Sequence, residues 1–140
     1  MKTITPYLLK FTLTITVLTI IFRYFLSYGI EENNTSNIVT LSAVIYFFLM
    51  LGSGWYFGKM DGEYLPISDV GFRFHLVTYL IHNGISILWI MLGLGSKYET
   101  LNLSRTVAFY WGIFILFHFF LFLKKRKKTI NSLDKEDLFE

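Results

Sequence analysis

Four long apolar segments are the feature that most constrains the fold of this 140-residue chain. They lie near residues 6–28, 38–57, 74–94 and 106–123. Each has roughly the 20 predominantly apolar residues that a helix needs to cross the hydrocarbon of a bilayer. Backbone polar groups in that medium must be paired within the protein, and no segment has the alternation of a barrel strand. We therefore expect an all-α integral membrane protein with four transmembrane helices in an antiparallel bundle.

The composition agrees with a lipid environment. Hydrophobic residues make up 54% of the chain and charged residues 16%, whereas a soluble domain carries about 25% charged residues. A chain this short cannot bury so much apolar surface in a core of its own. The absence of cysteine excludes disulfides, thiolate metal sites and a cysteine nucleophile. Residues 1–123 are expected to form one transmembrane domain, and residues 124–140 a cytoplasmic tail that is basic and then acidic.

The basic segment Lys124–Lys128 sets the expected orientation. Lysine and arginine concentrate on the cytoplasmic side of membrane proteins, so the C-terminus is predicted to be cytoplasmic. An even number of spans places the N-terminus on the same side. The expected location is the plasma (inner) membrane, as a multi-pass protein. Lys124–Lys128 should also attract anionic lipid headgroups, at about 1 kcal/mol per basic residue near the surface.

Polar residues recur at helical spacing inside the spans, where they are expected to face the bundle interior because contact with lipid is costly. The first span carries Thr12, Thr16, Thr19 and Arg23. The third carries His75, Tyr79 and His82, with Asn83 beside them. His118 lies on a similar stripe of the fourth span. These polar stripes predict that the four helices pack into a compact bundle.

A second group of charged residues lies between the second and third spans, and together with the stripes it defines a candidate functional patch. The patch comprises Arg23, Asp61, Glu63, Asp69, Arg73, His75, Tyr79, His82, Asn83 and His118. A metal or haem is not expected. His75 and His82 are two turns apart on one helix, and His82 and His118 are expected at different depths, so no ligand set converges.

No catalytic motif accompanies these residues. The chain lacks the Gly-x-Ser-x-Gly elbow, the His-Glu-x-x-His pair and a glycine-rich phosphate loop. We therefore expect a non-enzymatic accessory component without a cofactor. It would bind another membrane protein, a second copy of itself or a small apolar ligand within the bilayer, and no nucleic acid.

Two alternatives remain open at this point. In the first, the protein is a protomer of a small transporter or channel, with a polar path along Thr12, Thr16, Thr19 and Arg23 that continues to His82 and Asn83. In the second, it is a membrane enzyme with a site at the cytoplasmic face in the 61–75 loop. That site would use Asp61, Glu63, Asp69, Arg73 and His75 as acid, base and partner groups.

Overall fold

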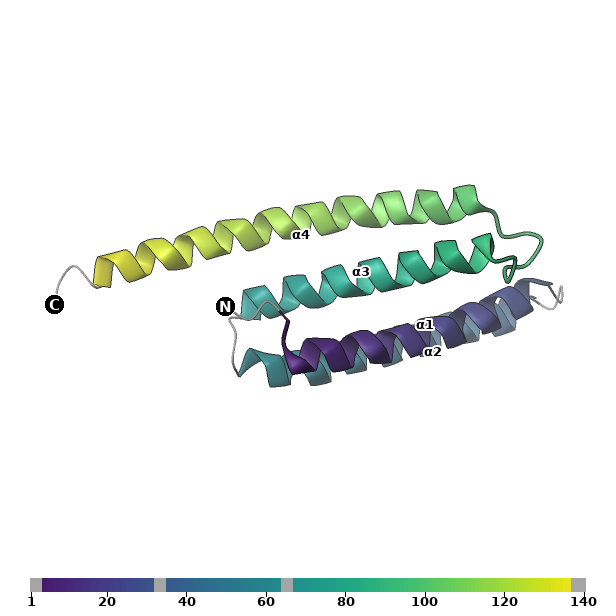
Figure 1. The fold of residues 1–140 in the computed structure, drawn as a ribbon, viewed down its shortest axis with the longest axis horizontal. Helices are drawn as coiled ribbons and strands as arrows, with labels where there is room; N and C mark the ends of the chain where they lie inside the picture. The colour runs from purple at the N-terminus through teal and green to yellow at the C-terminus, as the bar shows by residue number, and fades with distance from the viewer. Residues whose placement is uncertain (1–3, 32–34, 64–66, 137–140) are drawn as a thin grey trace.

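The computed structural model describes residues 4–31, 35–63 and 67–136, without the side chains of 35–36, 67–69, 126 and 128–136. Every regular element in these ranges is a helix (Figure 1). The four helices are α1 (Pro6–Glu31), α2 (Thr35–Gly62), α3 (Ile67–Met91) and α4 (Leu101–Glu136). Each is long and apolar enough to cross a membrane. The prediction of a helical membrane protein with four candidate spans is therefore confirmed.

Two helices extend well beyond the spans predicted from hydropathy. Helix α3 begins at Ile67, seven residues before the expected span, and α4 continues to Glu136. With 36 residues, α4 is about 54 Å long at a rise of 1.5 Å per residue. The hydrocarbon of a bilayer is only about 30 Å thick. The basic segment after Leu123 is thus part of a continuous helix.

Side-chain caps define where two of the helices start. Thr5 precedes α1, and its hydroxyl accepts a hydrogen bond of 3.1 Å from the backbone N–H of Leu8. Pro6 occupies the first helical position, where the missing N–H costs nothing. Thr100 caps α4 in the same way and accepts a bond of 3.3 Å from the N–H of Leu103. Both are the residue types that satisfy the free amides of a first turn.

A glycine ends α3. Gly93 has a φ of 72°, which is in the left-handed region that residues with a Cβ avoid. Its N–H donates to the carbonyl of Ile90 and the N–H of Leu94 donates to the carbonyl of Trp89, both at 3.0 Å. This pair of bonds is the Schellman motif, which uses the last free carbonyls of the helix. The chain then turns toward α4.

The helices do not pack equally. Helix α1 contacts α2 and α3, and α2 also contacts α3, whereas in the described part of the chain α4 contacts α3 alone. In Figure 1, α4 lies against α3 on the side away from α1 and α2. The buried apolar core consists of Leu8, Phe11, Ile15, Val70 and Phe74 from α1 and α3, and partly buried Met50 and Phe57 of α2 pack against it. The structure therefore differs from the expected compact bundle, because three helices share the core and the fourth is attached to one of them.

Large apolar side chains cover the outside of the molecule. Trp55 of α2 is 78% exposed and Phe114 of α4 is 73% exposed, and many smaller apolar residues are also open. A soluble monomer rarely exposes apolar surface on this scale. Such a surface is what lipid chains would contact.

Candidate functional site

The separation of α4 from α2 leaves a groove of about 1040 Å³. Phe11 and Phe74 of the core form part of its floor. Its walls come from three helices and include Trp55, Gly58 and Lys59 of α2, His75 and Thr78 of α3, and Trp111, Phe114 and His118 of α4. Most of this lining is apolar. The groove lies in the half of the molecule where α2 ends and α3 begins.

Four titratable side chains line this groove in the described part of the chain. They are Lys59, Glu63, His75 and His118. Three of the four, Glu63, His75 and His118, belong to the candidate patch predicted from the sequence. The combination of broad apolar walls with a few polar groups is typical of a site for an amphiphilic molecule.

The two groove histidines face each other across α3 and α4. The Nδ1 atoms of His75 and His118 are 3.4 Å apart, and their ring centroids are 4.8 Å apart with the planes at 90°. Phe72 stacks on His118 with a centroid separation of 6.1 Å. The sequence did not predict this pairing, since His75 was expected at the edge of its span. It lies eight residues inside α3, about 12 Å from the start at the helical rise.

His82 belongs to a different cluster. Its Nδ1 lies 3.0 Å from the hydroxyl of Tyr46, and that hydroxyl lies 3.0 Å from Oγ1 of Thr19. Phe22 stacks on the Tyr46 ring at 4.5 Å. This hydrogen-bonded chain joins α1, α2 and α3 in the interior. His82 is thus a histidine satisfied across helices, with Tyr46 as its partner.

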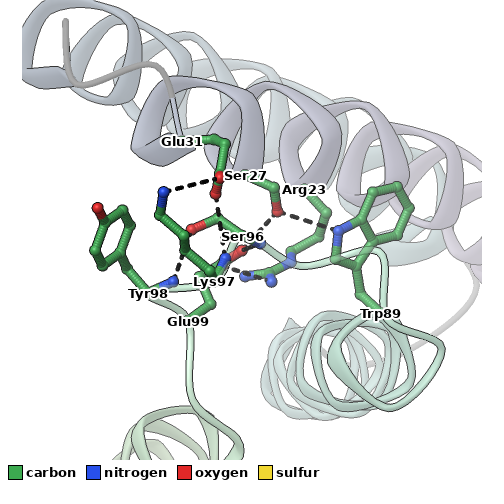
Figure 2. Close-up of polar contacts among 8 residues, drawn as sticks. All are labelled: Arg23, Ser27, Glu31, Trp89, Ser96, Lys97, Tyr98 and Glu99. Atoms are coloured by element: carbon green, nitrogen blue, oxygen red, sulfur yellow. Dashed lines mark hydrogen bonds and ion pairs between the residues drawn. The ribbon is translucent and has the colours of Figure 1, made fainter.

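A third cluster surrounds Arg23, near the connection between α3 and α4 (Figure 2). The Nη2 atom of Arg23 lies 2.7 Å from Oε1 of Glu99, and both side chains are less than 10% exposed. Oε2 of Glu99 accepts hydrogen bonds from the Ser27 hydroxyl at 2.6 Å and from the Ser96 N–H at 2.9 Å. The Trp89 indole donates to Ser27 at 3.1 Å. Glu99 was missed in the sequence because it lies in the segment between the third and fourth spans, whereas its partner Arg23 lies in the first.

Among the remaining stripe residues, Thr12, Thr16 and Asn83 donate to carbonyls of their own helix, whereas Tyr79 reaches α4. The hydroxyls of Thr12 and Thr16 donate to carbonyls one turn earlier in α1, at 2.8 Å each. The amide of Asn83 donates to the carbonyl of Tyr79, whose hydroxyl donates to the carbonyl of Ala108 in α4 at 3.1 Å. In the first stripe, Thr19 bonds to Tyr46 of α2 and Arg23 pairs with Glu99 of the segment between α3 and α4.

The loop patch does not gather at one point. Asp61 is fully buried, and its Oδ2 accepts a hydrogen bond of 2.8 Å from the hydroxyl of Thr5, the α1 cap. Glu63 is exposed and Arg73 is half-buried. The side chain of Asp69 lies outside the described residues. The Asp61 carboxylate therefore supports the start of α1, where a negative charge also complements the helix dipole.

Exposed lysines continue the line of α4 beyond the groove. Lys124 follows the groove residue Leu121 by three positions, and Lys125 and Lys127 come next. All three are exposed, whereas the side chains of Arg126 and Lys128 lie outside the described residues. The groove thus ends close to a basic surface.

A second cavity of about 350 Å³ lies between α1 and α2. Its lining is almost entirely apolar and includes Phe22, Phe25 and Ile45. None of the described residues that line it is charged, so they offer nothing that would recognise a headgroup.

No family model, no curated protein and no solved structure matches the chain. Its function must be inferred from the groove and from the clusters around it.

Proposed function

We propose that this protein is a non-enzymatic, multi-pass component of the plasma membrane that binds an acyl-chain amphiphile with an anionic headgroup. The observation that carries the proposal is the groove between α2, α3 and α4, with its apolar walls and its small set of polar groups. The occupant we infer is an anionic phospholipid.

The size and shape of the groove suit such a molecule. Small-molecule sites usually measure about 300–1,000 Å³, and this groove is at the upper end of that range. Trp55 and Phe114 border it and are themselves exposed to the surroundings of the protein. An acyl chain can therefore enter sideways from the bilayer and lie along Trp111 and Phe114, as dispersion contacts favour.

Positively charged lysines in and near the groove would favour an anionic headgroup. Lys59 lines the groove, and the exposed lysines of α4 begin one turn beyond it. Glu63 is the only acidic residue among the described lining residues. Neutral imidazole N–H groups of His75 or His118 add hydrogen-bond donors. A phosphate near Lys59 and the exposed lysines of α4 would be favoured over a zwitterionic headgroup.

The orientation inferred from the sequence belongs to this proposal. With an antiparallel arrangement and both termini cytoplasmic, the groove opens toward the cytoplasmic leaflet. That leaflet carries the anionic lipids, and its surface potential attracts basic segments. The lysines after Leu123 would hold the same class of headgroup outside the groove.

Native mass spectrometry with phosphatidylglycerol and phosphatidylcholine tests the proposal. Gly58 lines the groove, and a Cβ there would make only an ordinary contact of 3.7 Å with Val70. Gly58→Leu should therefore fill the groove without disturbing the core. Gly52→Leu is the matched control, because Gly52 lies on the same helix with open space around it and outside the groove. Both changes raise helix propensity equally.

The expected result is preferential binding of phosphatidylglycerol by the natural protein and by Gly52→Leu, with roughly tenfold weaker binding by Gly58→Leu. Equal binding of the two lipids, or equal binding by the two leucine variants, would rule out the groove as an anionic-lipid site.

A transporter protomer is the second candidate, and the Thr19–Tyr46–His82 chain favours it because these groups link three helices in the interior. Tyr46→Phe removes the central hydroxyl and keeps the ring. Proton flux in proteoliposomes that falls in Tyr46→Phe, and not in the exposed control Tyr56→Phe, would support transport.

A further inference from the structure

The His75–His118 pair in the groove has a geometry that its hydrogen bonding does not fully explain. The two Nδ1 atoms are 3.4 Å apart. An ordinary hydrogen bond from an N–H group spans about 2.7–3.2 Å between heavy atoms. The pair therefore lies at the long limit for a hydrogen bond between two imidazoles.

The same separation matches two ligands of one metal ion. Imidazole nitrogens bind Zn²⁺ at about 2.0–2.1 Å, and two such ligands at a tetrahedral angle lie roughly 3.3–3.4 Å apart. Both atoms that face each other are Nδ1, and neutral imidazole binds metals through either ring nitrogen. The separation of the two nitrogens is thus already that of two ligands of one ion.

We propose that His75 and His118 form a two-histidine site for a divalent transition metal ion, with Zn²⁺ as the main candidate. The site would bridge α3 and α4, the one helix contact that α4 makes among the described residues. The stacking of Phe72 on His118 helps to hold that ring in place, as outer-shell partners do in known metal sites.

The site is open on the groove side. His75 is exposed and His118 is half-buried, and both line the groove. Among the described residues no cluster of three or more His, Asp or Glu side chains could hold a metal ion. Two positions of a four-coordinate ion would therefore belong to water or to a molecule in the groove. Metal binding at this pair does not depend on the proposed lipid.

The test is metal binding by the purified protein in detergent, without lipid and without a polyhistidine tag. Zn²⁺ is titrated by calorimetry, and Co²⁺ replaces it for an absorption spectrum that reports tetrahedral nitrogen ligation. The variants are His75→Gln and His118→Gln. His82→Gln is the matched control, because His82 is the third histidine and is bonded to Tyr46 instead. Size-exclusion chromatography and thermal unfolding of each variant verify that it is folded.

We expect one Zn²⁺ per chain in the natural protein and in His82→Gln, and a roughly tenfold or greater loss of affinity in each groove variant. A folded protein that takes up no Zn²⁺ would overturn the proposal. So would binding that persists unchanged in both His75→Gln and His118→Gln. Phosphatidylglycerol binding by the natural protein is measured separately, so the lipid proposal is judged on its own result.

Discussion

The carboxylate of Glu99 lies 2.7 Å from the guanidinium of Arg23 and ties the connection between α3 and α4 to α1. Arg23 lies eight residues before the end of α1, about 12 Å along the helix axis. The connecting segment therefore folds back between the helix ends. The Ser27 hydroxyl and the Ser96 N–H complete the hydrogen bonding of Oε2 (Figure 2). Glu99 is thus bonded to α1 and to its own loop at the same time.

Glu99→Gln should destabilise the protein strongly. The change removes the negative partner and leaves the Arg23 charge buried, which typically costs about 3–5 kcal/mol. The measurement is thermal or denaturant unfolding in a mild detergent.

Glu31→Gln is the control, because Glu31 pairs with Lys97 at 3.5 Å while both side chains are largely exposed. An exposed pair contributes about 0–1 kcal/mol. A loss in Glu99→Gln as small as that in Glu31→Gln would contradict a structural role for the buried pair.

Thr5→Val should loosen the start of α1. The hydroxyl of Thr5 caps the helix at Leu8 and donates to buried Asp61, so its removal frees an amide and leaves a carboxylate without its donor. We expect a loss of about 1–3 kcal/mol in unfolding free energy. The control Thr14→Val removes a hydroxyl that bonds only to the Lys10 carbonyl of its own helix, and it should change stability by less than about 0.5 kcal/mol. Equal effects would show that the contact with Asp61 is unimportant.

Gly112 controls the approach of α4 to α3. A Cβ at this position would lie 3.1 Å from the Tyr79 hydroxyl, which is held by its own 3.1 Å bond to the Ala108 carbonyl. Gly112→Ala should be less stable than Gly52→Ala, a change in open space, by about 1 kcal/mol.

Tyr79→Phe removes the obstructing hydroxyl and supplies the second arm of this test. In that background the penalty of Gly112→Ala should disappear, which a double-mutant cycle measures. A penalty that persists in full would mean that α3 and α4 are held apart by something other than this contact.

The chain contains no cysteine, so single cysteines report topology without background. Lys97→Cys lies between α3 and α4, and Lys127→Cys lies near the far end of α4; both positions are exposed. With cytoplasmic termini, a membrane-impermeant maleimide added to intact cells should label position 97 and not position 127. The reverse pattern would invert the proposed orientation and place the groove in the outer leaflet.

The number and type of the helices follow from hydropathy, because about 20 apolar residues have few other stable structures in a chain this small. The ends of the helices do not follow from it. Polar residues such as Arg73 and the lysines after Leu123 continue α3 and α4 past the apolar segments, since a helix can extend into water. Because α3 begins at Ile67, His75 lies well inside the helix and not at its edge, and its pairing with His118 was therefore not predicted.

The polar stripes predicted which side chains are buried, but they did not predict which residues those side chains bond to. Thr19 and Arg23 are buried as their spacing indicated, yet their partners Tyr46 and Glu99 come from other segments. Helical periodicity reports which face of one helix is turned inward. It contains no information on the rotation of the next helix, so cross-helix pairs required the structure. The open groove was likewise beyond prediction, because it depends on α4 contacting one helix among those described.

The length of α4 has a mechanical consequence. One uninterrupted helix carries the groove residues Trp111 and His118 and, further along, the exposed lysines, and among the described helices it packs against α3 alone. A force on the lysines, from a charged surface or from another protein, would therefore tend to rotate α4 about its contact with α3. A rotation of α4 about its contact with α3 would therefore change the width of the groove and the direction of the basic end together.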